Sequence, residues 1–172
     1  CATCDGFFYR GKDVAVVGGG DTAAEEALYL SGLAEKVYLI VRRNELRASQ
    51  VMRERLLKKE NITILYEHET VSLTGEGKLE HAILRNKATG ALETIDISGF
   101  FLAIGHTPNT VAFPQVETDE QGYIKVASPT QATNIPGVFA AGDVCDPLYR
   151  QAVNAAASGC RAALDAERFL AR

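Results

Sequence analysis

The sequence predicts an α/β fold in which a parallel sheet is followed by an antiparallel β-meander. Short apolar runs alternate with helical segments as far as residue 66. A strand, helix, strand, helix, strand order implies parallel strands joined by right-handed crossovers. After Glu67 the runs become strands of alternating apolar and polar residues, separated by glycine-containing turns. That second pattern is typical of antiparallel strands.

The parallel part begins with residues 13–17 (DVAVV), a short β-branched run that predicts a buried strand. Three glycines follow directly. The helix expected over 21–31 places alanines and leucines on one side and ends at Gly32. The remaining parallel elements are a strand over 36–41, a helix over 49–59 and a strand over 62–66.

The meander is expected to consist of strands over 71–73, 79–85 and 92–97, after which residues 100–104 return to the parallel sheet. Residues 105–114 contain two prolines and predict a loop at a domain boundary. The elements expected beyond this loop are a short strand pair over 122–126, a buried strand over 137–141 and a long helix over 150–170.

Composition excludes several classes of protein. The chain of 172 residues (18.6 kDa) is one domain of ordinary size or a fragment of something larger. Hydrophobic residues make up 47% and charged residues 23%, which excludes a disordered or collagen-like chain. The net charge of -4 argues against a general nucleic-acid role. No apolar run reaches the roughly 18 residues of a membrane span, and no cleavable signal pattern precedes Cys1.

A glycine-rich turn is the first motif that carries chemistry. Residues 18–23 (GGGDTA) match the pattern G-x-G-x-x-A and lie between a predicted strand and a predicted helix. Glycines let the backbone approach a pyrophosphate, and the helix N-terminus offers it unpaired N–H groups and partial positive charge. The turn therefore predicts a Rossmann-like dinucleotide site. A glycine-rich turn without a ligand is the alternative.

The end of the next strand indicates which dinucleotide is bound. NAD-binding domains carry Asp or Glu there, on the ribose 2′-hydroxyl, whereas this chain has Arg42 and Arg43, followed by Arg47. Guanidinium groups match phosphate oxygens in charge and geometry. The arginines therefore predict NADP(H), bound through its 2′-phosphate. The alternative is a solvated basic face, which suits the cations of residues 53–59.

Cys1 and Cys4 form a C-x-x-C pair, and Asp5 follows directly. This spacing permits a disulfide and lets one thiol resolve a bond made by the other. The adjacent acid could supply or accept the proton. A zinc site is the alternative, but zinc needs four ligands. The other residues of metal-binding type are isolated in the sequence: Cys145, Cys160, His68, His81 and His106.

A last motif follows the strand expected over 137–141. This strand ends in Gly142 and Asp143, which places a turn and a carboxylate at the carboxyl end of a strand, where α/β sheets bind ligands. Gly-Asp is also an ordinary turn, so the pair becomes specific only through a family resemblance.

Five motifs follow one another along the chain: CATCD at 1–5, the glycine turn continued by EEALYL at 25–30, the arginines, GVFAAGD at 137–143 and YRQA at 149–152. In this order and spacing they closely resemble the low-molecular-weight, bacterial-type thioredoxin reductases. The resemblance covers nearly the whole chain. It implies an enzyme in which NADPH reduces a bound FAD, the flavin reduces the C-x-x-C disulfide, and the dithiol reduces thioredoxin.

The resemblance also implies a role for each motif. Cys4 is expected to be the sulfur on the flavin side, Cys1 the thiol that attacks thioredoxin, and Asp5 the general acid or base. The residues implied to line the NADPH site are Gly19, Gly20, Asp21, Thr22 and Glu25, with Arg42, Arg43 and Arg47 on the 2′-phosphate. The residues implied for FAD are Gly142 and Asp143 at the ribityl and pyrophosphate region, and Arg150, Gln151 and Ala152 beside the isoalloxazine.

The same resemblance implies that the chain is a fragment. Family members have a second dinucleotide fold before the C-x-x-C, and this chain has a single G-x-G-x-x-A. We expect an NADPH-binding domain over 1–110 and the C-terminal part of the FAD-binding domain over 111–172, inactive without the rest of that domain. Val41 departs from the family, in which His commonly precedes the paired arginines.

The full-length protein is expected to be a cytoplasmic homodimer. Two alternative functions fit the same motifs. One is the flavoprotein reductase of a peroxidase (alkyl hydroperoxide) system, which shares the architecture but serves another redox domain. The other is a non-catalytic NADP-binding module.

Overall fold

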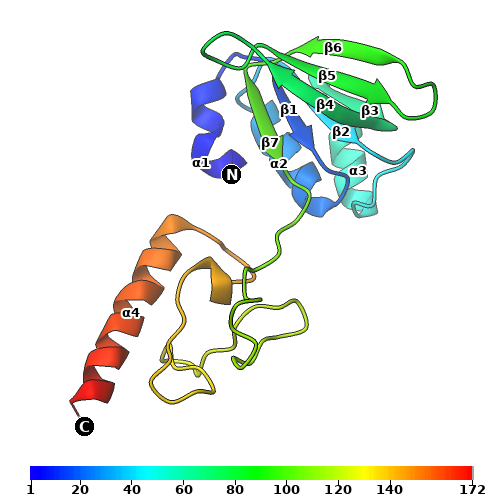
Figure 1. Ribbon diagram of the computed structural model, residues 1–172. Coiled ribbons are helices and arrows are strands. Elements are labelled where there is room, and N and C mark those ends of the chain that lie inside the picture. Colours follow the sequence, from blue (N-terminus) through cyan, green and yellow to red (C-terminus); the bar gives the residue numbers. More distant parts are fainter. Residues whose placement is uncertain (172) are drawn as a thin grey trace. The chain divides into compact units, whose positions relative to one another are not determined.

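A computed structural model of the chain describes residues 1–171, which fall into two compact units (Figure 1). Unit 1 is Cys1–Gly105, and unit 2 begins at His106. The division lies inside the loop over 105–114, where the sequence predicts a domain boundary, and it comes after residue 105 rather than after 110.

Unit 1 is built on a four-stranded parallel sheet in the order β3-β2-β1-β7. Its strands are β1 (Val14–Val17), β2 (Val37–Val41), β3 (Ile62–Tyr66) and β7 (Gly99–Leu102). Val16 on the central strand β1 is in register with Leu39 on β2 and with Phe101 on β7. The predicted parallel order, including the return of the last strand after the meander, is confirmed.

Helices cover one face of this sheet. They are α2 (Asp21–Ser31) and α3 (Gln50–Leu57). Ala27 and Leu30 of α2 and Leu56 of α3 are at most 1% exposed, and they share one hydrophobic cluster with Val16 and Leu39 of the sheet. The alanines of α2 allow the helix to approach the strands closely. The glycine turn before the helix is therefore held at the carboxyl end of the central strand β1.

The meander covers the other face. Its strands β4 (His68–Thr74), β5 (His81–Asn86) and β6 (Leu92–Asp96) pair antiparallel in that order. Ala82 and Leu84 of β5 pack against Ala15 and Ile40 of the parallel sheet. Neighbouring residues of a strand face opposite sides of a sheet, and each side here is covered. Unit 1 therefore has three layers: helices, parallel sheet and meander (Figure 1).

The first residues form short helices that the sequence does not predict. They are α1 (Ala2–Asp5) and the 3-10 helix η1 (Gly6–Tyr9). Ala2 is 1% exposed and belongs to the cluster that includes α2. A Cβ at Gly6 would lie 3.0 Å from the side chain of Leu30. These contacts hold the C-x-x-C segment against α2.

Unit 2 contains one long helix among its described residues, α4 (Ala152–Leu170), close to the predicted 150–170. The buried strand predicted over 137–141 is wrong, since this run makes only the isolated bridge between Ala132 and Phe139. The strand pair predicted over 122–126 is likewise reduced to a bridge between Thr118 and Ile124. A strand needs a hydrogen-bonded neighbour, and the described residues offer these runs no more than single bridges.

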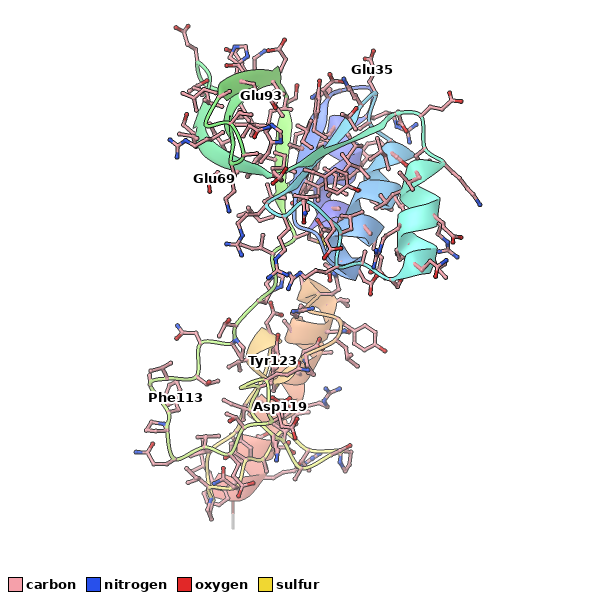
Figure 2. The ribbon with its side chains drawn as sticks, turned by 90° about the vertical axis from the view of Figure 1, so that its right-hand side faces the viewer. Glu35, Glu69, Glu93, Phe113, Asp119 and Tyr123 are labelled. Atoms are coloured by element: carbon pink, nitrogen blue, oxygen red, sulfur yellow. The ribbon has the colours of Figure 1, made fainter. Side chains whose placement is uncertain are left out.

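The core of unit 2 is small. Val116, Ile124 and Ala140 are its buried members. The turn beside it is held by Asp119, whose carboxylate accepts the N–H groups of Gln121 at 2.8 Å and Tyr123 at 3.0 Å (Figure 2). None of the helices in residues 1–171 combines the length and the apolar composition that crossing a membrane requires.

Candidate functional site

The glycine turn joins β1 to α2. Gly18 has a φ of 152°, and a Cβ there would lie 2.3 Å from the carbonyl oxygen of Ala103 and 2.7 Å from Cβ of Ala23. Any side chain at this position is therefore excluded. Gly20 precedes α2 without a side-chain cap, and a Cβ on it would meet no atom within 4 Å. The positive end of α2 thus borders open space, as an anion-binding turn requires.

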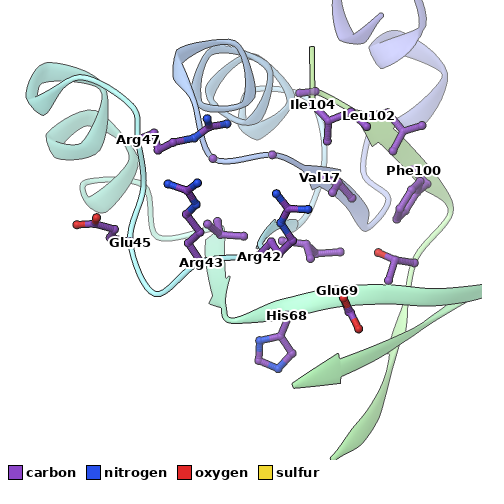
Figure 3. Close-up of a pocket in the computed structure, with 16 residues that line it drawn as sticks. Val17, Arg42, Arg43, Glu45, Arg47, His68, Glu69, Phe100, Leu102 and Ile104 are labelled. Atoms are coloured by element: carbon purple, nitrogen blue, oxygen red, sulfur yellow. The ribbon is translucent and has the colours of Figure 1, made fainter. Parts of the chain in front are cut away.

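Arg42, Arg43 and Arg47 follow β2 and are exposed. Together with Gly18 and Gly19 they line a cavity of about 530 Å³. Figure 3 shows the three guanidinium groups directed toward the same space beside the glycine turn. Two motifs that are separate in the sequence therefore form one site, and the concentrated positive charge favours an anionic ligand.

The remaining wall of the cavity is mostly apolar. Phe100, Leu102 and Ile104 contribute to it, and Leu102 and Ile104 are 60% and 67% exposed. Thr70 also lines the cavity, and its buried hydroxyl makes no hydrogen bond within the described residues. Glu69, the acidic residue beside it, accepts a hydrogen bond from Arg85 at 3.3 Å. A cationic end next to an apolar wall suits a phosphorylated nucleotide.

Four of the expected NADPH-site residues line this cavity: Gly19, Arg42, Arg43 and Arg47. The other four do not line it: Gly20, Asp21, Thr22 and Glu25. Asp21, Thr22 and Glu25 are exposed on the first turns of α2. Their expected part in NADPH binding stays a prediction.

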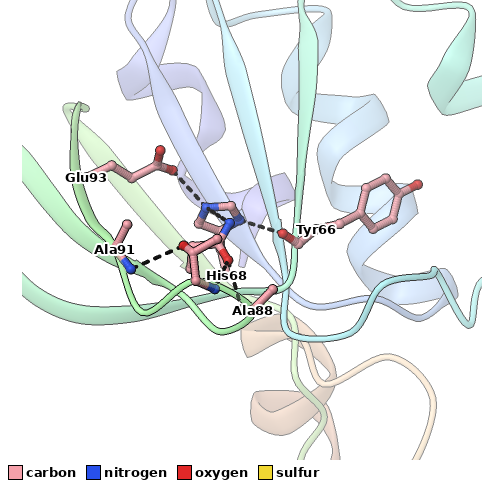
Figure 4. A network of polar contacts seen from close by, with 7 residues as sticks. Tyr66, His68, Ala88, Ala91 and Glu93 are labelled. Atoms are coloured by element: carbon pink, nitrogen blue, oxygen red, sulfur yellow. Dashed lines mark hydrogen bonds and ion pairs between the residues drawn. The ribbon is translucent and has the colours of Figure 1, made fainter.

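His68 is a residue of this cavity that sequence reasoning missed. The ring is 9% exposed, and Figure 4 shows it between the carbonyl of Tyr66, which Nδ1 contacts, and the carboxylate of Glu93, 3.1 Å from Nε2. His81 similarly lies 2.9 Å from Asp96. Both histidines are isolated in the sequence but have partners across the meander. These pairs depend on the register of the meander strands, which cannot be read from the sequence.

Cys1 precedes α1 as its N-cap residue, Cys4 lies within the helix, and both cysteines are exposed. The sulfur atoms of Cys1 and Cys4 are 2.7 Å apart, and the carbonyl oxygen of Cys1 accepts the N–H groups of Cys4 and Asp5, each at 3.1 Å. One helical turn therefore brings the two sulfurs together on the surface, with the exposed carboxylate of Asp5 next in the chain. No group of three or more His, Cys, Asp or Glu side chains that could hold a metal ion occurs within residues 1–171.

In unit 2 the Gly-Asp motif forms a turn against α4. Gly142 has a φ of 82°, and its N–H donates to Oγ of the buried Ser158 at 2.9 Å. Asp143 begins the 3-10 helix η2 (Asp143–Cys145) and is exposed. The turn therefore presents a carboxylate to solvent while α4 fixes its backbone.

The expected isoalloxazine segment lies at the start of α4. Arg150 has a φ of 48°, and its guanidinium donates to the hydroxyl of Tyr123 at 3.2 Å. Gln151 precedes the helix without a side-chain cap bond, and Ala152 is its first residue. The segment thus joins a positioned guanidinium to the positive end of a 19-residue helix. Its contact with a flavin stays a prediction.

Asp146 organises this segment and was not singled out in the sequence. Its carboxylate accepts the N–H groups of Leu148 at 3.0 Å, Tyr149 at 2.9 Å and Arg150 at 2.9 Å. Burial by itself would raise the pKa of Asp146, but these backbone bonds and the side-chain amide of Asn154 outweigh it, so the pKa is lowered. The ionised carboxylate thus accepts the amide of Arg150, whose backbone is left-handed.

Asp146→Ala is expected to lower the local unfolding free energy of residues 148–150 by about 1–2 kcal/mol at pH 7, since three backbone bonds to a carboxylate are lost. A carboxyl whose folded pKa is lowered stabilises the fold above its ordinary pKa of 3.8, and this contribution disappears as the pH falls through the folded value. Hydrogen exchange at these amides, compared at pH 7 and at about pH 2, measures the difference. The exposed Glu167 of α4, changed to alanine, is the control. An equal difference at both pH values contradicts the assignment.

The two remaining cysteines differ from each other. The thiol of Cys145 is half-buried and donates to the carbonyl oxygen of Gly142 at 3.3 Å. Burial, followed by the neighbouring carboxylate of Asp146, raises the pKa of Cys145, which makes it a poor nucleophile. Cys160 is exposed on α4 and is therefore not a buried thiol.

The glycine turn between β1 and α2, with arginines after β2, defines a dinucleotide-binding α/β fold that also carries a C-x-x-C pair. The family model of pyridine nucleotide-disulphide oxidoreductases matches residues 1–159. The chain belongs to this family.

The chain is also similar to individual thioredoxin reductases. It is 51% identical to the thioredoxin reductase of Streptomyces clavuligerus over 172 residues, which cover 99% of this chain and 53% of that protein. The solved thioredoxin reductase of Giardia duodenalis is 46% identical with a TM-score of 0.83, covering 100% of this chain and 57% of its own. The solved enzyme of Streptococcus pyogenes MGAS5005 is 34% identical with a TM-score of 0.91, covering 99% of this chain and 56% of its own.

These findings confirm the resemblance drawn from the motifs. The chain spans about half the length of the curated relatives it matches.

Proposed function

We propose that this chain is the part of a thioredoxin reductase that binds NADPH, carries the redox dithiol and completes the FAD site. The observation that carries the proposal is the placement of the exposed Cys1–Cys4 pair and the arginine-lined cavity in one compact unit. The names of the relatives, at about half identity over 99% of the chain, support it. A cytoplasmic homodimer is proposed on this resemblance alone.

The residues of unit 1 fit NADPH. The turn at Gly18 has no room for a Cβ, and Gly20 leaves the end of α2 open to a pyrophosphate. Arg42, Arg43 and Arg47 would hold the 2′-phosphate, which distinguishes NADPH from NADH. The apolar wall of the cavity offers contact area to the adenine base, which is attached to the same ribose.

The residues of unit 2 fit part of an FAD site. Gly142 and Asp143 would hold the ribityl and pyrophosphate region, and Arg150, Gln151 and Ala152 would lie beside the isoalloxazine. The fit rests on the tight turn at Gly142, fixed by Ser158, and on the uncapped start of α4. FAD, when bound, supplies a carrier that takes up a hydride and passes on two electrons.

The proposed dithiol step uses the closeness of the two sulfurs at the start of α1. Two electrons and two protons convert the Cys1–Cys4 disulfide into two thiols. The thiolate of Cys1 attacks the disulfide of thioredoxin, forms a mixed disulfide and releases one thioredoxin thiolate. Cys4, whose sulfur lies 2.7 Å from that of Cys1, then attacks Cys1, re-forms the internal disulfide and releases the second thiolate. Asp5, the exposed carboxylate next in the chain, would exchange a proton with the departing thiolate.

The test uses the protein that carries this chain, loaded with FAD, and follows NADPH oxidation with thioredoxin or with a peroxiredoxin-linked redox domain as acceptor. NADPH-dependent reduction of thioredoxin supports the proposal. Reduction of the peroxidase partner alone identifies the reductase of a peroxidase system. NADPH binding without flavin and without turnover identifies a non-catalytic NADP-binding module.

A further inference from the structure

We infer that Asp21 is a positioning residue for Arg47 and thereby contributes to the choice of NADPH over NADH. Oδ1 of Asp21 accepts the N–H of Ser49 at 2.7 Å. Ser49 lies two residues after Arg47 and directly before α3. This inference rests on the proposed NADPH site and adds to it the group that holds the arginine loop in place.

A second tie joins the same two segments. The carbonyl oxygen of Gly19 accepts the N–H of Arg47 at 2.7 Å and the N–H of Ala48 at 3.0 Å. The consecutive amides of residues 47–49 therefore all donate to the glycine turn and the first residue of α2. The Gly19 carbonyl is present in any variant, so Asp21 is the part of the clamp that a substitution can remove.

Electrostatics supports this assignment over direct contact with the nucleotide. A carboxylate beside a pyrophosphate repels it, which lowers affinity unless the carboxylate has another task. Asp21 stands in the first turn of α2, where negative charge is tolerated, and its Oδ1 is occupied by Ser49. Asp21 also lies outside the lining of the cavity that Arg47 faces. The carboxylate therefore acts on the ligand through the loop.

Loss of the Asp21 bond is expected to weaken the binding of NADPH, which carries the 2′-phosphate, more than the binding of NADH. When the Asp21 bond is lost, Arg47 keeps its charge and its own amide bond to Gly19, but the loop after it loses its tie to α2. The guanidinium is then held less firmly, so the ligand that Arg47 contacts is affected most. Asp21→Ala is expected to raise the Kd for NADPH by about tenfold and to change the Kd for NADH less than about twofold. Asp21→Asn keeps an acceptor for Ser49 and is expected to stay within about threefold of the parent protein for NADPH.

The decisive experiment is a double-mutant cycle on nucleotide affinity, measured by calorimetry at low ionic strength for NADPH and NADH. Asp21→Ala is made in the parent protein and in an Arg47→Ala variant. In the second background its effect on NADPH is expected to fall below about twofold, because the group it positions is gone. The exposed Glu60, changed to alanine, is the control for loss of one negative charge.

Hydrogen exchange gives a readout that needs no nucleotide. Asp21→Ala is expected to speed exchange at the amide of Ser49 and its neighbours, whereas Asp21→Asn and Glu60→Ala leave it near the parent rate. If NADPH does not bind the parent protein, the proposed function fails while the exchange result still tests the clamp.

Three results overturn the inference. Tighter NADPH binding in Asp21→Ala and in Asp21→Asn shows that the carboxylate faces the phosphates. Equal weakening of NADPH and NADH shows a general role in the fold of the turn. An undiminished effect of Asp21→Ala in the Arg47→Ala background shows that Asp21 does not act through Arg47.

Discussion

Cys4→Ser is expected to lower NADPH-dependent reduction of thioredoxin by at least about a thousandfold, which corresponds to roughly 4 kcal/mol of lost transition-state stabilisation. Without Cys4 no internal disulfide can form, so electrons taken up by the flavin have no disulfide in the protein to reduce. The remaining thiol, Cys1, is exposed directly before α1 and can still attack a disulfide. A stopped assay should therefore show a mixed disulfide between the variant and thioredoxin, stable because no neighbouring sulfur resolves it.

The complementary variant separates the roles of the two thiols. Cys1→Ser is expected to lose turnover to the same extent, but to form much less of the mixed disulfide if Cys1 is the attacking thiol. Cys160→Ser is the control, since this exposed cysteine lies on α4 in unit 2, and full turnover is expected. Non-reducing electrophoresis and mass spectrometry identify the linked sulfurs. Equal trapping by Cys1→Ser and Cys4→Ser would falsify the assignment of the attacking sulfur.

The parallel sheet and the helices that cover it could be predicted because each of these elements is specified locally. The run DVAVV, the glycine turn and the alanine-rich face of α2 each match one element, and all three agree. The meeting of the glycine turn and the three arginines at one cavity was predictable for the same reason. A strand end followed by two arginines occupies a position that the parallel order fixes beside the glycine turn.

The parts that could not be predicted depend on contacts between distant residues. The partners of His68 and His81 come from the register of β4, β5 and β6, which includes a bulge between Thr70 and Ser72. The turn at Asp146 depends on a carboxylate that accepts three backbone N–H groups. Such a turn has no periodic sequence pattern by which it could be predicted.

The strand predicted over 137–141 was wrong because apolar composition alone does not produce a strand. The apolar run GVFAA has the composition of a buried strand, yet Val138 is 38% exposed and the run makes one bridge in the described residues. Apolar and β-branched residues favour a pleated, buried surface. A strand also needs a hydrogen-bonded neighbour from another part of the chain, which the composition of the run itself does not indicate. The helix α4 was predictable, because a helix satisfies its own backbone groups.

The three arginines yield the last prediction, which concerns nucleotide choice. Replacing Arg42, Arg43 and Arg47 together by alanine is expected to weaken NADPH binding by about a thousandfold and to leave NADH binding within about twofold. Each exposed guanidinium is expected to contribute about a tenfold factor through charge-assisted bonds to the 2′-phosphate, which NADH lacks. The salt dependence of NADPH binding should become shallow at the same time, because its origin is the charge of the same groups.

A control must separate the position of the arginines in the cavity from their positive charge. Arg55→Ala removes one positive charge from α3 at a residue outside the cavity lining, so the change in NADPH affinity is expected to stay below about twofold. Single replacements of Arg42, Arg43 and Arg47 then show how the selectivity is distributed. Calorimetric titrations with both nucleotides measure the ratio directly. If Arg55→Ala weakens NADPH as much as Arg43→Ala does, the basic residues attract the nucleotide only as a diffuse field, and the cavity at the end of β2 does not read the 2′-phosphate.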